Sequence, residues 1–218
     1  MRQDLSFIHR FEPAPRPDAR PLLLLHGTGG NEDDLLPLGR MIAPGAALLS
    51  PRGKVLETGM PRFFRRLTEG VFDEEDVRAR AHELADFVIA AQHAYGVAAP
   101  MALGYSNGAN IAAAVLLLRP EVLAGAMLLR AMVPLAEVPL AAEAPGAGLT
   151  GRPVLIVSGN HDPIAPADNA ARLAAMLKQA GAVVQHRSVP TGHALSQADI
   201  NLARQWLKKA EARLGVAS

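Results

Sequence analysis

The chain contains no cysteine among its 218 residues. This absence excludes disulfide bonds, thiolate metal ligands and cysteine nucleophiles together, so covalent catalysis would have to use another side chain. Aromatic residues are also scarce, at 4% of the sequence, although hydrophobic residues make up 50%. Alanine, leucine and valine must therefore build most of the hydrophobic core.

A charge excess and long apolar runs are missing as well. The net charge is +1 and no block of lysine and arginine stands out. This balance gives no reason to expect nucleic acid or an anionic membrane as a partner. No apolar run approaches the roughly 18 residues of a membrane span, and the N-terminal residues lack the apolar core of a signal peptide. We therefore expect a soluble cytoplasmic protein without stable membrane insertion.

Short apolar runs alternate with helical patterns along the chain. Runs typical of buried strands lie at 22–25, 46–49, 100–103, 123–129 and 154–157. Weaker alternation at 5–11 and 183–189 indicates edge strands, and residues 54–72 are expected to be irregular. Helices are predicted at 32–41, 73–95, 109–118, 170–180 and 196–214. The alternation predicts an α/β fold with a mainly parallel sheet covered on both faces. Because no linker or repeat is visible, we expect one domain over residues 1–218.

The most informative motif is Gly104-Tyr-Ser106-Asn-Gly108, which lies between a predicted strand and a predicted helix. This is the layout of a nucleophile elbow, in which a sharp turn exposes a serine hydroxyl. The two glycines suit a turn where strand and helix pass too closely for side chains. An ordinary strand-to-helix turn is the alternative explanation.

Polar residues also follow other predicted strands. Asp162 and His193 come after two of them, and ligands of open α/β sheets bind at this edge. The order Ser106, Asp162, His193 is that of nucleophile, acid and base in α/β-hydrolases. A serine hydroxyl needs a base within hydrogen-bond reach, and a carboxylate that orients this base. We therefore predict a catalytic triad of these three residues.

Other residues compete for these roles. His161 adjoins the proposed acid on the same loop, and His26 precedes a glycine-rich loop where a structural role is favoured over catalysis. Among the acids, Asp168 is expected to cap a helix, and Asp199 falls within the last helix.

Acyl transfer also needs hydrogen-bond donors for an oxyanion. The N–H groups of Asn107 and Thr28 are the candidates, the second from the loop His26-Gly-Thr-Gly-Gly30. A plain glycine-rich turn or a phosphate-binding loop is the alternative for this segment. Neither a P-loop nor a Gly-x-Gly-x-x-Gly motif is present, which argues against nucleotide binding. We expect no cofactor and no metal.

Taken together, several motifs resemble the phospholipase/carboxylesterase family of small α/β-hydrolases. They are His26-Gly-Thr-Gly-Gly-Asn-Glu-Asp-Asp-Leu35, Pro51-Arg-Gly53, Gly104-Tyr-Ser-Asn-Gly108, Ser158-Gly-x-x-Asp162-Pro-Ile-x-Pro166 and Gly192-His193. The resemblance implies the same triad and oxyanion donors, an α/β-hydrolase fold without a large cap domain, and often a homodimer. It also implies hydrolysis of short- to medium-chain carboxylic esters. Many members carry Gln after the nucleophile, so Asn107 suggests a bacterial esterase branch.

Without a cap, the substrate pocket must come from loops. The expected apolar lining comprises Met60, Phe63, Phe64, Leu67, Met132, Val133, Leu135 and Leu195. Packing of these residues beneath a long loop is the alternative. Arg62, Arg65 and Arg66 are expected to form a solvated face. The alternative is that one of them pairs with a carboxylate or phosphate of the substrate.

Three functions are compatible with these patterns. The leading prediction is a serine carboxylesterase that forms an acyl-enzyme on Ser106. An acyl-thioesterase or lysophospholipase would use the same triad. A non-catalytic α/β-fold binding module is the third possibility, against which the complete triad argues.

Overall fold

The computed structural model describes residues 5–15, 19–137 and 148–215. A seven-stranded sheet runs through this part of the chain in the order β1-β3-β2-β8-β9-β10-β11. Only the pairing of β1 with β3 is antiparallel, so the expected mainly parallel α/β sheet is confirmed. In chain order, the strands are β1 (His9–Glu12), β2 (Leu22–Leu25), β3 (Leu48–Pro51), β8 (Met101–Tyr105), β9 (Gly125–Leu129), β10 (Pro153–Gly159) and β11 (Val183–Val189).

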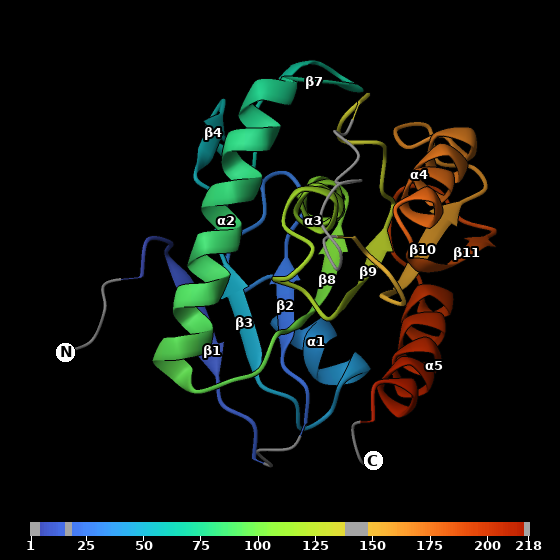
Figure 1. Cartoon of the computed structure of the whole chain (residues 1–218). Helices are drawn as coiled ribbons and strands as arrows, with labels where there is room; N and C mark the ends of the chain where they lie inside the picture. The colour runs from blue at the N-terminus through green and yellow to red at the C-terminus, as the bar shows by residue number, and fades with distance from the viewer. Residues whose placement is uncertain (1–4, 16–18, 138–147, 216–218) are drawn as a thin grey trace.

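Helices cover both faces of the sheet. They are α1 (Leu36–Ile42), α2 (Glu74–Tyr95), α3 (Asn107–Leu118), α4 (Ala167–Gln179) and α5 (Gln197–Arg213). Successive side chains of a strand point to opposite faces. Accordingly, Leu23 and Leu25 belong to the core cluster that includes residues of α2, α3 and α4, whereas Leu22 and Leu24 belong to the cluster that includes residues of α1 and α5. Figure 1 shows α2 crossing the sheet over β1 and β3.

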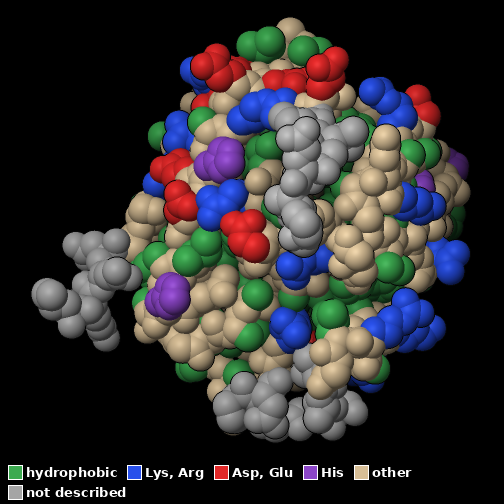
Figure 2. All heavy atoms as spheres, in the orientation of Figure 1, with side chains coloured by type: hydrophobic (Ala, Val, Ile, Leu, Met, Phe, Trp, Pro, Cys, Tyr) green, Lys and Arg blue, Asp and Glu red, His purple; other side chains and the backbone are tan. Residues whose placement is uncertain are grey.

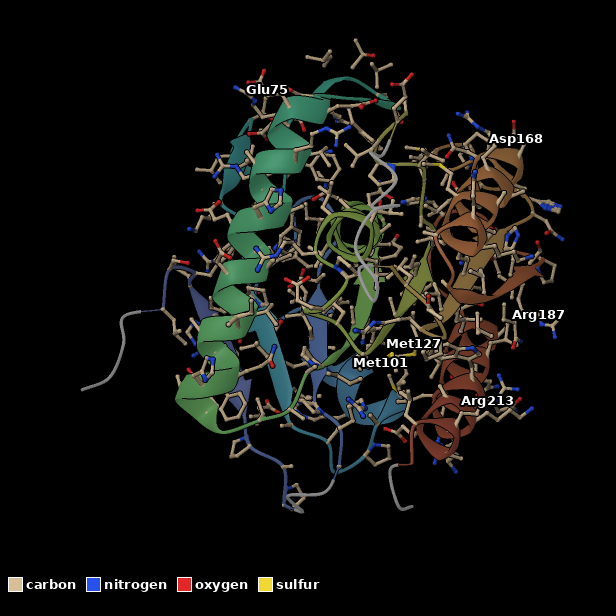
Figure 3. The ribbon with its side chains drawn as sticks, in the orientation of Figure 1. Glu75, Met101, Met127, Asp168, Arg187 and Arg213 are labelled. Carbon is tan, nitrogen blue, oxygen red and sulfur yellow. The ribbon has the colours of Figure 1, made fainter. Side chains whose placement is uncertain are left out.

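The face packed against α1 and α5 contains two methionines at the centre of the sheet. Met101 on β8 and Met127 on β9 lie close together in Figure 3, and both are fully buried. Aliphatic and methionine side chains thus take the place of the aromatic residues that the sequence lacks, because unbranched methionine fills irregular gaps.

Two of the predicted helix starts have clear chemical causes. The Asp73 side chain accepts a hydrogen bond from the Asp76 N–H at 3.2 Å and caps α2. A capping box between Ser196 and Asp199 begins α5. The helix expected from residue 32 begins only at Leu36, because Asn31 Oδ1 accepts the Asp33 N–H at 2.8 Å and holds a separate turn.

Residues 54–72, expected to be irregular, form two short hairpins between β3 and α2. The first pairs β4 (Val55–Glu57) with β5 (Met60–Arg62), and the second pairs β6 (Arg66–Thr68) with β7 (Val71–Phe72). Phe63 and Phe64, which join the hairpins, are 3% and 0% exposed and anchor the segment in the core. The hairpins lie at the end of the molecule toward which β2 and β8 point (Figure 1).

The helices α2 and α4 begin at this same end, as the labelled Glu75 and Asp168 in their first turns show in Figure 3. Basic and acidic side chains are interspersed over the face seen in Figure 2. Of the helices in the described residues, none combines the length and apolar character needed to cross a bilayer.

Candidate functional site

Ser106 lies at a strained turn between β8 and α3. Its backbone angles are φ 53° and ψ −116°, in the region that favours glycine. A Cβ on Gly104 would stand 2.6 Å from the Ala109 Cα, and one on Gly108 would stand 1.9 Å from the Leu25 carbonyl oxygen. Both contacts are shorter than any side chain tolerates, so the turn requires glycine at these two positions.

Three polar side chains form one chain of hydrogen bonds at this turn. The Ser106 Oγ lies 2.9 Å from His193 Nε2. On the other side of the imidazole, His193 Nδ1 lies 2.8 Å and 3.0 Å from the two carboxylate oxygens of Asp162. A carboxylate accepts only, so Nδ1 carries the proton and Nε2 is free to accept from the serine hydroxyl. The structure therefore brings together the three residues predicted as a triad.

The surroundings of Asp162 keep it ionised. Its side chain is fully buried. Burial alone raises the pKa of the carboxyl, but hydrogen bonds from the Ala165 and Ile164 N–H groups and from His193 outweigh this effect. The pKa of Asp162 consequently lies below its ordinary value, and at neutral pH a buried negative charge faces the imidazole.

Two backbone N–H groups near Ser106 are available to a ligand. Thr28 and Asn107 both line the cavity that contains Ser106. Within the described residues, the N–H of neither makes a hydrogen bond to the protein. The glycine loop runs close to the serine, since a Cβ on Gly27 would lie 3.6 Å from the Ser106 Cβ. These N–H groups are in a position to serve as the predicted oxyanion donors.

Side-chain and backbone contacts tie the two hairpins to these donor segments. The Phe63 N–H donates to Asn107 Oδ1 at 2.7 Å, and the Gly29 N–H donates to the Pro61 carbonyl oxygen at 2.9 Å. His26 is buried and accepts the Gly53 N–H at 3.0 Å, while its Nδ1 donates to the Gly27 carbonyl oxygen. His26 thus holds the glycine loop, and burial lowers its pKa.

Arg130, at the end of β9, contacts the loop that carries His193, and sequence reasoning missed it. Its fully buried guanidinium donates to Asp199 at 2.7 Å and 3.0 Å, and to the carbonyl oxygens of Gly192 and Ala194 at 3.0 Å and 3.1 Å. Its Nε also lies 4.0 Å from the Asp162 carboxylate. The backbone at Arg130 has a positive φ of 57°. No local motif marks this residue, and its position directly after the predicted strand at 123–129 was the only sequence signal.

A cavity of about 240 Å³ opens at Ser106 and His193. One wall comes from the hairpins, through Arg62, Arg66 and Phe72. A second wall, from the loops after β9 and β10, includes Met132 and Ile164. The Met132 N–H is held by the Asn110 side chain at 2.8 Å, so the first turn of α3 supports both walls, through Asn107 and Asn110.

The eight apolar residues expected to line a pocket occupy different places. Met132 lines the cavity. Phe63, Phe64 and Leu135 are buried in the core, against which Val133 packs, and Leu195 packs against the core on the other face of the sheet. Met60 and Leu67 are exposed at 40% and 68%. Phe72 and Ile164, which were not expected there, supply apolar lining instead.

The three arginines of residues 62–66 also occupy different environments. Arg62 and Arg66 line the cavity, whereas Arg65 forms an ion pair with Asp73 at 2.8 Å and is 63% exposed. Among the competing residues, His161 is exposed, and Asp199 belongs to the capping box of α5. Asp168 lies in the first turn of α4, whose N-cap is Pro166. Groups of three or more His, Asp or Glu side chains able to hold a metal do not occur in the described ranges.

Comparisons with known proteins agree with this architecture. No family model matches the chain. The Bacillus subtilis protein named "Putative hydrolase MhqD" is 47% identical over 191 residues, which span 87% of this chain and 92% of that protein. The crystal structure of the Bacillus cereus carboxylesterase is 42% identical, with a TM-score of 0.90 over 95% of this chain and 96% of that one.

A carboxylesterase structure from Mesorhizobium loti is 34% identical, with a TM-score of 0.87 over 94% of this chain and 96% of that one. Relatives of this similarity, matched over nearly their whole length, share the fold and the family. The chain therefore belongs to the phospholipase/carboxylesterase family of small α/β-hydrolases and, with them, to the carboxylic ester hydrolases.

Proposed function

We propose that the chain is a serine carboxylesterase that hydrolyses short- to medium-chain carboxylic esters through an acyl-enzyme on Ser106. The observation that carries this proposal is the continuous hydrogen-bond chain from Ser106 through His193 to Asp162. An alcohol at the start of such a chain is a nucleophile at neutral pH, because the imidazole removes its proton during attack.

In the acylation step, the Ser106 oxygen attacks the ester carbonyl carbon and its proton passes to His193 Nε2. The ionised Asp162 holds the tautomer that can accept this proton and stabilises the imidazolium that forms. The N–H groups of Thr28 and Asn107 stabilise the negative carbonyl oxygen of the tetrahedral intermediate. The intermediate then expels the alcohol, which takes the proton from Nε2 and leaves the acyl group on the serine.

In the deacylation step, water takes the place of the alcohol. His193 accepts a proton from water as it attacks the acyl-enzyme, and the same two N–H groups stabilise the second oxyanion. Collapse returns the proton to the serine oxygen and releases the carboxylic acid. The protein needs no cofactor for either step, because each proton removed by His193 is returned within the same step.

Cavity size favours short acyl groups over the long acyl chains of a lysophospholipase or a long-chain acyl-thioesterase. At about 240 Å³, the cavity lies below the range of roughly 300–1,000 Å³ typical of sites for drug-sized ligands. Polar side chains such as Arg62, Arg66 and Asn110 contribute to its lining. A short acyl group suits this space, whereas a long lipid chain would extend into solvent.

Covalent labelling and an ester panel test the proposal together. A fluorophosphonate should label wild-type protein on Ser106 and leave the Ser106→Ala variant unlabelled. The variant should also lose several orders of magnitude in kcat on p-nitrophenyl esters. Across esters of rising chain length, kcat/KM should peak among the short acyl groups. A peak at long acyl chains would favour the alternative, and absence of any adduct would favour a non-catalytic binding module.

A further inference from the structure

Two arginines stand in the wall of the catalytic cavity. Arg62 ends β5 and Arg66 begins β6, and both line the cavity that contains Ser106 and His193. The Arg62 side chain is only 3% exposed, and that of Arg66 is 28% exposed. Burial of a guanidinium is costly and requires compensation by partners of opposite charge. The acidic groups that pair with Arg62 and Arg66 therefore determine whether either guanidinium is free to bind a ligand.

A single carboxylate serves both arginines. Arg62 Nη1 lies 2.9 Å from Glu57 Oε2, and Arg66 Nε donates to Glu57 Oε1 at 2.9 Å. Burial lowers the pKa of Arg62; the charge of Glu57 opposes this shift, and the nearby charge of Arg66 adds to it. The two guanidinium groups thus repel each other across one shared anion. Arg62, Arg66 and Glu57 together carry one excess positive charge.

Arg66 keeps free donors and lines the cavity that contains Ser106. Arg62 is held further by a bond from its Nε to the Phe64 carbonyl oxygen at 3.2 Å. Arg66 donates through Nε to Glu57, and in the described part of the chain its two Nη groups make no hydrogen bond to the protein. The N–H groups of a guanidinium form a planar fork that matches the two oxygens of a carboxylate.

One further acidic residue shares the cavity. Glu69 lies in the exposed turn between β6 and β7 and lines the same space. Within the described residues it forms no ion pair with Arg62 or Arg66. Its charge weakens the positive potential of the cavity, but within the described residues it does not occupy the Nη groups of Arg66.

We propose that Arg66, supported by Arg62 and Glu57, binds a free carboxylate on the substrate. The preferred substrates are then monoesters of short dicarboxylic acids, whose ester carbonyl reaches Ser106 while the far carboxylate meets Arg66. This inference rests on the proposed esterase function and names its substrate class.

A matched pair of esters tests the inference. Monoethyl glutarate and ethyl pentanoate have acyl chains of equal length and differ in a terminal carboxylate or methyl group. Their hydrolysis is followed by titration of the released acid, and the measured quantity is the ratio of their kcat/KM values. We expect the ratio to favour the glutarate ester in the wild type, and to fall on the order of tenfold in Arg66→Gln, mainly through KM.

Two neighbouring variants provide controls. Arg65→Gln removes an adjacent arginine outside the cavity and should keep the wild-type ratio. Glu69→Gln removes the competing charge and should raise the ratio. In the wild type, added NaCl should lower the ratio, because screening weakens attraction between the arginine and the ester carboxylate.

Each result has a defined meaning. If Arg66→Gln has the same ratio of kcat/KM values as the wild type, the inference is overturned. The proposed esterase function is unaffected, provided that the variant still hydrolyses ethyl pentanoate. If Arg66→Gln does not fold, the salt series on the wild-type protein decides instead. A ratio that does not change with NaCl then overturns the inference. If the wild type hydrolyses neither ester nor any p-nitrophenyl ester, the proposed function itself fails.

Discussion

At Ser106, the backbone angles that expose the hydroxyl are angles that residues other than glycine rarely adopt. The values of φ 53° and ψ −116° store strain, which costs on the order of 1–3 kcal/mol. A protein keeps such strain only where the surrounding structure enforces it. Here the enforcement comes from the close approach of β8, α3 and Leu25 at Gly104 and Gly108.

This strain leads to a prediction about stability. Ser106→Gly and Ser106→Ala should both abolish esterase activity, but the glycine variant should be more stable. Relief of strain outweighs the entropic cost of glycine, and we expect a difference of about 1 kcal/mol in the free energy of unfolding. Urea unfolding of the two variants measures it. An alanine variant as stable as the glycine variant would show that the turn is unstrained.

Individual residues differed in how far the sequence revealed them. Ser106, Asp162 and His193 each follow a predicted strand, so the rule that ligands bind at strand ends brought them together in advance. Arg130 also directly follows a predicted strand, at 123–129, but it belongs to no motif. Its partners Gly192 and Asp199 lie 62 and 69 positions further along the chain. Met60 and Leu67 are apolar and lie within two residues of Arg62 and Arg66 in the sequence, yet only the three-dimensional packing shows that they are exposed.

At the scale of elements, β9 and the loop before α5 are joined through Arg130. The Arg130 side chain donates to Thr191, Gly192 and Ala194 around His193, and it pairs with Asp199 at the start of α5. Arg130 is not among the residues that line the cavity. We therefore regard Arg130 as a positioning residue that acts through the loop of His193.

Arg130→Lys tests this role. Lysine keeps the charge opposite Asp199 but lacks the planar guanidinium whose N–H groups donate to several carbonyl oxygens at once. We expect kcat to fall by about 10- to 100-fold with KM nearly unchanged, because misplacement of the base weakens proton transfer rather than substrate binding. Steady-state kinetics on a p-nitrophenyl ester measures both constants.

Arg187→Lys, on the edge strand β11, is the matched control, since Arg187 is exposed (Figure 3) and is not among the residues that line the cavity. It should behave as the wild type. A change in KM alone for Arg130→Lys would contradict the positioning role.

Among the elements, the long helix was predictable from the sequence and the shortest strands were not. The long helix α2 carries an acidic first turn, regular apolar spacing and a glycine at its end, and it was predicted almost to the residue. The hairpins of residues 54–72 have strands of two or three residues, too short to show an alternating pattern. Their formation depends on the burial of Phe63 and Phe64, which is a tertiary effect.

For the molecule as a whole, buried carboxylates link stability to pH. Burial raises the pKa of Asp199, but hydrogen bonds from Arg130 and Ser196 outweigh this and lower it, as a similar balance does for Asp162. A carboxyl with a lowered folded-state pKa stabilises the fold fully above its unfolded-state pKa of about 3.9. This contribution is lost as the pH falls through the folded-state value.

We therefore expect the free energy of unfolding to fall steeply on acidification below about pH 4. Asp199→Asn should be less stable than the wild type at neutral pH, because Arg130 then stays buried without its counter-charge. The loss on acidification should also be shallower in this variant. Urea unfolding at a series of pH values from about 7 to about 3 tests both points. If the free energies of unfolding of the variant and the wild type fell in parallel with pH, the contribution assigned to Asp199 would be wrong.

The residues that perform the proposed chemistry and those that select the ester occupy different stretches of the chain. Ser106, Asp162 and His193 belong to the strand ends of the central sheet, whereas the arginine wall belongs to a hairpin insert between β3 and α2. The insert is anchored by Phe63, Phe64 and two hydrogen bonds, one to the Asn107 side chain and one from the Gly29 backbone N–H. Substitutions at the cavity-lining positions of the insert can therefore alter which ester is accepted without replacing a residue of the triad, provided that the contacts to Asn107 and Gly29 are kept.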